Sequence, residues 1–261
     1  MNHSTHHSHE HAPLAIIVNG PSSSGKSTLC KALLDRLTDL ACGDPEASFA
    51  RVAFDDLVVL MSDKRFPISY VQLQGGDLTR LASRSPHDGR AGWGYVDESH
   101  APGRHGGSPR LRIVLNSHVR RLLSGLQRSW GAHLKLGTNL IIDHFIQDAD
   151  WCQELLNVVR DSAAQVFMVR VECGLAELER RESFRGDGKL EGRPLGLARR
   201  SDELCHAHAL PYNITVHTDR QTTDQSVAAI IAALLSSSLM PRGAGGVLGS
   251  ARFFGTHAEF D

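Results

Sequence analysis

Residues 16–28 read IIVNGPSSSGKST, an apolar run that passes into small residues, one lysine and two hydroxyl side chains. Residues 20–27 match the phosphate-loop pattern G-x-x-x-x-G-K-[ST] at every position. Glycines let the backbone turn consecutive N–H groups onto anionic oxygens, and the following helix adds its positive end. A flexible Ser/Gly linker is the alternative, but a linker explains neither the apolar run before the motif nor the amphipathic pattern after it. The stretch therefore predicts a phosphate-binding loop between a strand and a helix.

Each position of this loop has an expected role. Lys26 is expected to reach the β and γ phosphates of a nucleotide, and the Ser27 hydroxyl to ligate Mg²⁺. The residues predicted to bind the nucleotide are Gly20, Ser22, Ser23, Ser24, Gly25, Lys26, Ser27 and Thr28. The motif alone predicts a nucleotide and not a reaction, because kinases, GTPases and ATPase motors share it.

Bulk composition narrows the class of protein. The chain has 261 residues, 41% of them apolar, and a net charge of −1. This composition gives no indication of a broad basic surface that would bind nucleic acid or an anionic membrane. No apolar run is long enough to span a membrane. The five cysteines are scattered and form no C-x-x-C pair, which fits reduced thiols in a cytoplasmic protein.

Hydrophobic periodicity predicts strands that alternate with helices. Five buried strands are expected at 14–19, 49–56, 139–145, 165–173 and 213–218. Helical stripes are expected from Lys26 to Gly43, from Leu111 to Trp130, around Trp151–Val159 and over 225–235. This alternation predicts an α/β P-loop NTPase fold in three layers, with a central five-stranded parallel sheet and helices on both faces.

Three regions fall outside that pattern. The tail at 1–13 carries five histidines, and both metal chelation and an inert disordered terminus explain it. Residues 85–109 are dense in Gly, Pro and His and predict a long exposed loop or flap. The Gly-rich end at 237–261 predicts a second tail. The P-loop domain is therefore expected to span 14–236.

Acidic residues follow two of the predicted strands. Asp55 and Asp56 end the second strand, and Asp143 ends LIID. In an open parallel sheet these positions lie beside the phosphate loop. One carboxylate would accept a proton from an attacking hydroxyl, and Asp143 would hold Mg²⁺ through water. The ordinary alternative is a helix cap or a solvated turn.

Arginines gather in a glycine-broken segment at 177–200. Arg185, Arg193 and Arg199 suit a lid that neutralises phosphate charge and excludes water. The start of the segment, Glu177 to Arg181, also reads as an ordinary solvated helix face, and the residues alone do not choose between the two.

With these residues assembled, the chain resembles the chloramphenicol phosphotransferase-like family, P-loop kinases with a shikimate-kinase-like fold. The matching pieces are NGPSSSGKS, AFDDL, IIDHF, VRVECGLAELERRESFRGD, the GLA at 196–198 and YNITVHT, in the family's order over about 14–236. The series from VRVEC to GLA is the most specific of these, because the phosphate loop occurs in many families.

The resemblance implies ATP- and Mg²⁺-dependent transfer of the γ-phosphate to a hydroxyl of a small molecule. The family's general base falls on Asp55, with Asp56 the alternative after a one-residue slip, and its lid arginines fall on Arg185 and Arg193. The connection at 62–109 is longer than the family's and differently composed. The acceptor is therefore not implied, and chloramphenicol, another antibiotic and a metabolite all stay open, as does the oligomeric state.

Two other functions share the motif. Metallochaperone GTPases also combine a His-rich N-terminus with an early phosphate loop, but their guanine-selecting Asn-Lys-x-Asp motif is absent from this sequence. A nucleoside or metabolite kinase keeps the fold and changes only the acceptor.

Overall fold

A computed structural model describes residues 12–60, 93–99, 108–184, 195–237 and 239 of the chain. Several predicted features lie outside these residues: the histidine-rich tail, most of the 62–109 connection, Arg185 and Arg193, and nearly all of the Gly-rich end.

The centre of the molecule is a parallel sheet of five strands, as the sequence predicted. Its strands are β1 (Leu14–Asn19), β2 (Phe49–Ala53), β5 (Asn139–His144), β6 (Gln165–Glu172) and β7 (Ile214–His217), in the order β2-β5-β1-β6-β7. β1 is hydrogen-bonded to β5 on one side and to β6 on the other. Because β1 is covered on both faces, all six of its residues are buried, which explains its continuous apolar run.

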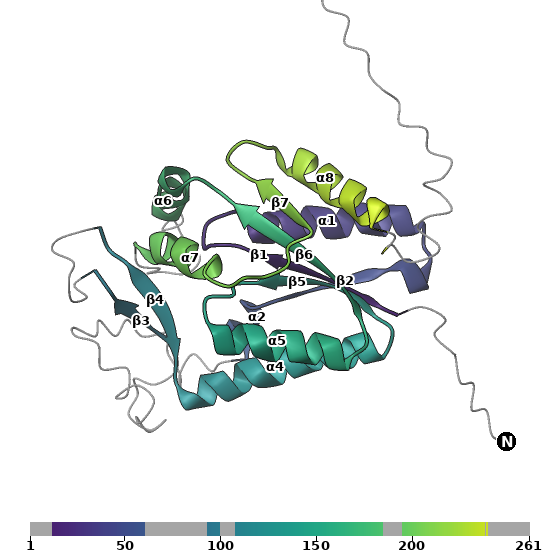
Figure 1. Cartoon of the computed structure of the whole chain (residues 1–261), viewed down its shortest axis with the longest axis horizontal. Helices are drawn as coiled ribbons and strands as arrows, with labels where there is room; N and C mark the ends of the chain where they lie inside the picture. The colour runs from purple at the N-terminus through teal and green to yellow at the C-terminus, as the bar shows by residue number, and fades with distance from the viewer. Residues whose placement is uncertain (1–11, 61–92, 100–107, 185–194, 238, 240–261) are drawn as a thin grey trace, which may run out of the picture.

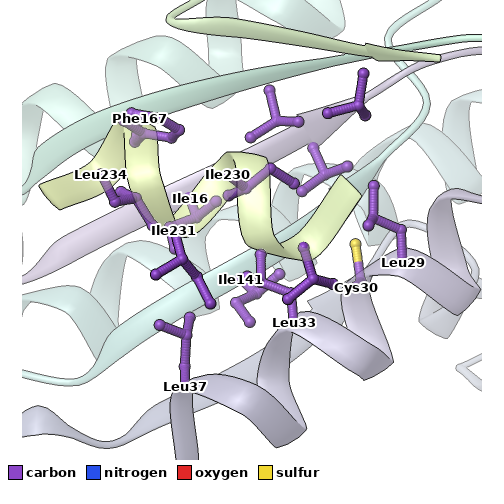
Figure 2. Close-up of a cluster of buried hydrophobic side chains, with 14 of the residues drawn as sticks. Ile16, Leu29, Cys30, Leu33, Leu37, Ile141, Phe167, Ile230, Ile231 and Leu234 are labelled. Carbon is purple, nitrogen blue, oxygen red and sulfur yellow. The ribbon is translucent and has the colours of Figure 1, made fainter. Parts of the chain in front are cut away.

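Helices cover both faces of this sheet (Figure 1). α1 (Lys26–Ala41) and α8 (Thr223–Ser236) lie together on one face, and α4 (Ser117–Lys135) and α5 (Ala149–Asp161) on the other. Figure 2 shows how Leu29, Leu33 and Leu37, spaced four residues apart on α1, meet Ile230 and Leu234 of α8 over the sheet. This spacing puts one apolar stripe of each helix into a shared core.

The expected helix from Leu111 to Trp130 is wrong in its first turn. Leu111–Leu115 form strand β4, which pairs antiparallel with β3 (Trp93–Asp97), and α4 begins only at Ser117. The Asn116 side chain ends the strand and caps the helix by accepting the Val119 N–H at 2.9 Å. The apolar residues at 111, 114 and 115 have the spacing that is typical of a helix. The segment forms a strand because it pairs with β3.

The predicted loop at 85–109 is also wrong where it crosses β3. The backbone of Trp93–Asp97 is extended and paired with β4. Pairing between strands distant in sequence provides this order, so the local Gly-rich composition gave no sign of it.

The remaining elements gather at the carboxyl end of the sheet, as Figure 1 shows. They are the short α2 (Asp56–Val59), the β3–β4 hairpin, α6 (Leu175–Phe184) and α7 (Leu197–Cys205). A second apolar cluster joins Ile113 of β4, Leu197 of α7 and Trp151 of α5 to Phe54 and Phe145 at the strand ends. Among the described helices none is long and apolar enough to cross a membrane.

Candidate active site at the phosphate loop

The phosphate loop takes the backbone form that its motif predicts. Ser23 and Gly25 have φ values of 65° and 86°, in the left-handed region that turns successive N–H groups to one side. Gly20 is required for a different reason, because a Cβ there would lie 2.5 Å from the Val171 carbonyl oxygen of β6. The first glycine thus lets β6 approach, and the second starts α1.

Two cavities meet at this loop. The first is lined by Ser22 to Ser27 together with Phe54, Asp55, Ile113, Asp143, His144, Phe145 and Leu197. The second is lined by Ser23, Gly25, Thr28, Leu29, Arg181, Thr218, Gln221, Thr223 and Ser226. Because Ser23 and Gly25 line both cavities, a ligand held by the loop can extend into the first cavity at one end and into the second cavity at its other end.

The two neighbouring acids between which the sequence left the choice open have different surroundings. Asp55 lines the cavity. Asp56 instead begins α2, and its Oδ2 accepts the Ala53 N–H at 2.8 Å. Asp56 therefore binds the backbone at the end of β2 with its side chain, whereas Asp55 belongs to the cavity wall.

Asp143 lies in the same cavity but has a partner that the sequence did not reveal. Its Oδ2 accepts a hydrogen bond from Arg51 Nη2 at 2.7 Å, and the residue is only 6% exposed. Because β2 and β5 are neighbours in the sheet, Ala53 faces Asp143 and Arg51 lies two residues earlier on β2. The arginine holds the carboxylate beside the loop.

His144 is a further cavity residue that was not among the predicted site residues. It is fully buried, and burial lowers its pKa to about 4, so that the imidazole is neutral at physiological pH. Its Nε2 lies 3.1 Å from Nε2 of Gln127 on α4. The only signal in the sequence is a histidine directly after the aspartate of IID, which is also a common pattern for an ordinary core residue.

The rest of this cavity wall is apolar. Phe54, Ile113, Phe145 and Leu197 come from four separate segments of the chain and line the first cavity, and none of them lines the second. All four side chains are buried in the same cluster. A ligand in this cavity would therefore meet hydrophobic surface on one part of the wall, and polar groups at the loop and at Asp55, Asp143 and His144.

Arg181 lines the second cavity and makes hydrogen bonds to the residues around it. Its guanidinium donates to the Ser24 carbonyl at 3.4 Å and to the Thr218 carbonyl at 2.8 Å, and its Nε pairs with Glu177 at 2.7 Å. The Thr218 hydroxyl also donates to the Ser24 carbonyl at 2.6 Å. The sequence left Arg181 open as part of a solvated helix face, because nothing in a charged run shows which side chain faces the loop.

The remaining predicted residues are placed as follows. Lys26 Nζ donates to the Pro21 carbonyl at 2.7 Å, so its ammonium lies folded over the loop. Ser27 lines the first cavity and Thr28 the second. Arg199 pairs with Glu179 at 2.6 Å, whereas Arg185 and Arg193 fall in the part that is not described.

Comparison with solved structures gives the class of fold. The APS kinase of Mycobacterium tuberculosis, solved with AMPPNP and APS, superposes with a TM-score of 0.50 at 14% identity, over 86% of this chain and 98% of the other. A candidate kinase of Chloroflexus aurantiacus gives 0.51 at 17% identity, over 87% and 98%. At such identities the likeness establishes the fold alone, which is that of the P-loop kinases.

The sequence also matches a family model. The model of the chloramphenicol phosphotransferase-like proteins covers residues 14–235, and the chain belongs to that family. The resemblance stated from the motifs is thereby confirmed. A comparison with curated proteins gave no match.

Proposed function

We propose that the protein is an ATP-dependent O-phosphotransferase that moves the γ-phosphate to a hydroxyl of a small molecule. One observation supports this most strongly: the Asp55 carboxylate and the phosphate loop with Lys26 line the same cavity. A phosphate donor on the loop and a proton acceptor across from it are the two requirements for transfer to an alcohol.

In the proposed step the acceptor oxygen forms a bond to the γ-phosphorus while the bond from that phosphorus to the departing ADP oxygen breaks. Asp55 takes the hydroxyl proton. The N–H groups of the loop and the ammonium of Lys26 hold the negative charge on the phosphate oxygens. Lys26 must first leave the Pro21 carbonyl, to which it is hydrogen-bonded here.

The oxygen donors at the loop fit Mg²⁺. The Ser27 hydroxyl and the Asp143 carboxylate line one cavity, and hydroxyl, carboxylate and phosphate oxygens are what this hard cation prefers. Ser27 would hold the ion directly and Asp143 through water. Bound there, Mg²⁺ would supply positive charge that neutralises the phosphates. Arg51 keeps the Asp143 carboxylate in place.

The second cavity suits the nucleoside part of the donor. It shares Ser23 and Gly25 of the loop with the first cavity, Asp55 is not among its lining residues, and Arg181 presents a flat cation at its wall. Guanidinium planes stack well on aromatic rings, including bases. This arrangement would leave the first cavity for the acceptor.

The walls of the first cavity favour an acceptor with an apolar body. Phe54, Ile113, Phe145 and Leu197 offer hydrophobic contact, and Asp55 and Asp143 disfavour an anionic ligand. Hydroxylated antibiotics, chloramphenicol among them, and apolar metabolites with one accessible hydroxyl have this chemistry.

A product screen tests the proposal. The full chain would be incubated with ATP and Mg²⁺ and a panel of hydroxylated antibiotics and metabolites, and the products analysed by mass spectrometry. The expected result is one phosphoryl group added to an alcohol, with ADP released in equal amount. Repeating the screen with GTP separates the kinase from a GTPase, because a GTPase would release phosphate without a phosphorylated acceptor. ATP binding followed by no transfer to any alcohol would contradict the proposal.

A further inference from the structure

One face of α7 meets the acceptor cavity and the phosphate loop at regular intervals. Leu197, Ser201 and Cys205 are spaced four residues apart, and each is at most 4% exposed. Leu197 lines the first cavity. Ser201 Oγ accepts the Ser22 N–H at 2.9 Å, and Cys205 Sγ donates to the Gly20 carbonyl at 3.4 Å. The helix α7 thus contacts both the first cavity and the phosphate loop.

The Ser201 hydroxyl is fixed by two hydrogen bonds. It donates to the Ala198 carbonyl at 2.9 Å, one turn earlier on α7, and uses a lone pair for the Ser22 N–H. Burial raises the pKa of the neighbouring Cys205 thiol to about 12, so this side chain stays a donor. Together the two side chains hold the first half of the loop, while Thr218 and Arg181 hold Ser24 in the second half.

α7 is itself anchored to its surroundings. The Glu182 carboxylate, from α6, accepts the Gly196 N–H at 2.8 Å and the Ala198 N–H at 2.7 Å. The Gly196 carbonyl accepts the Leu111 N–H of β4 at 3.0 Å. Glu98, next to β3, bridges Arg112 of β4 and Arg200 of α7, each at 2.7 Å or less. Because these bonds fix α7, its side chains can hold the phosphate loop in one position.

We propose that Ser201 is a positioning residue for phosphate binding. By holding the Ser22 peptide in one orientation, its hydroxyl keeps the loop in the phosphate-binding form before any ligand arrives. A loop that is already ordered loses less conformational entropy on binding than a loop that the ligand must order. The inference rests on the proposed function only in that the loop binds the phosphates of a nucleotide.

The test compares two buried serines. Ser201→Ala removes both bonds, whereas the matched control Ser162→Ala, at the end of α5, removes a hydroxyl that donates to the carbonyl three residues earlier and does not touch the loop. Dissociation constants for AMPPNP and for adenosine are measured by calorimetry on the full chain, and melting temperatures are recorded for each variant. A net hydrogen bond of about 1 kcal/mol corresponds to about fivefold in affinity.

Ser201→Ala is expected to weaken AMPPNP binding about three- to tenfold and to leave adenosine binding within about twofold, with Ser162→Ala unchanged for both ligands. Ser201→Cys keeps the shape of the side chain but replaces the oxygen by a larger atom that is a weaker acceptor, and its AMPPNP affinity is expected to lie between those of wild type and Ser201→Ala. It also supplies the measurement if the alanine variant does not fold. Equal weakening of both ligands, or no effect on AMPPNP, would overturn the inference. Wild-type protein that binds no AMPPNP would refute the proposed function itself.

Discussion

Asp55 and Asp56 are adjacent in the sequence, yet the fold gives their carboxylates different surroundings. Asp55 lines the cavity with Lys26, and the Asp56 side chain accepts the Ala53 N–H at the end of β2. Asp55 lies in the turn after β2 and Asp56 is the first residue of α2, so the change of backbone direction separates the two neighbours. The proposed general base is therefore Asp55.

Replacing each of these acids gives the first prediction. Asp55→Asn is expected to lower the rate of phosphoryl transfer by at least about 100-fold, because the amide cannot accept the hydroxyl proton. Binding of AMPPNP should stay within a few-fold. Asp56→Asn is the matched control, and it should retain transfer since the asparagine amide oxygen can also accept the Ala53 N–H. Steady-state rates and calorimetry measure the two effects, and a normal rate in Asp55→Asn would refute the assignment.

Arg181 gives a second prediction at this scale. Arg181→Ala removes the guanidinium from the second cavity together with its bonds to Ser24 and Thr218. We expect AMPPNP to bind about tenfold more weakly, or about 1.4 kcal/mol. The neighbouring Arg180 is the control, because it pairs with Glu177 and lies over the Phe184 ring without lining either cavity. If Arg180→Ala weakened AMPPNP binding as much as Arg181→Ala, the second cavity would not hold the nucleoside.

The sequence predicted the site residues that carry a motif and missed those that depend on packing. The phosphate loop, Asp55 and Asp143 were named because each follows an apolar strand. Arg51 and Arg181 were not, because their importance comes from partners 92 and 157 residues away. A charge in a strand or on a helix says nothing about which distant carboxylate or carbonyl it will meet.

At the scale of elements, α7 depends on a side chain from another helix for its beginning. Its N-cap, Gly196, makes no side-chain cap bond, and Glu182 of α6 accepts two of the first N–H groups instead. A carboxylate at this end also faces the positive end of the helix dipole.

Removing that carboxylate gives the third prediction. Glu182→Ala leaves two buried N–H groups without their acceptor, so the free energy of unfolding is expected to fall by about 3 kcal/mol. Glu179→Ala is the control on the same helix. Its pair with Arg199 is more exposed, and its loss is expected to change the stability by less than about 1 kcal/mol. Urea unfolding measures both, and equal losses would show that the Glu182 bonds contribute no more than a surface ion pair.

The elements that the sequence predicted best are those with a clear apolar pattern of their own. The stripes of α1, α5 and α8 and the apolar runs of the five parallel strands were assigned to the correct type. The hairpin was missed, because the Gly- and Pro-rich residues around β3 predict a loop, and β3 and β4 are ordered by pairing with each other. The N-terminal boundary of α4 was misplaced for the same reason.

At the scale of the whole molecule, His144 makes stability depend on pH. Its pKa in the folded chain is about 4, below the ordinary value of 6.5, because burial disfavours the charged ring. Between these two pH values the unfolded chain binds a proton that the folded chain does not. The contribution of His144 to stability is therefore complete above pH 6.5 and is lost as the pH falls toward 4.

This gives the fourth prediction. Between pH 7 and pH 5 the wild type is expected to lose about 2 kcal/mol of unfolding free energy more than His144→Gln, which has no group that titrates there. Urea unfolding of both proteins at the two pH values provides the comparison. Equal losses in the two proteins would show that His144 does not stay neutral in the folded chain.

The ion pairs that Glu98 makes with two separate segments limit how these segments can be exchanged between related proteins. Glu98 lies beside β3, and its two partners, Arg112 and Arg200, belong to β4 and to α7. A hairpin transplanted alone into another scaffold would arrive without the arginine that α7 supplies, and a transplanted α7 would lose the carboxylate. An exchange that keeps this network of ion pairs must therefore move both segments together, although they are distant in the sequence.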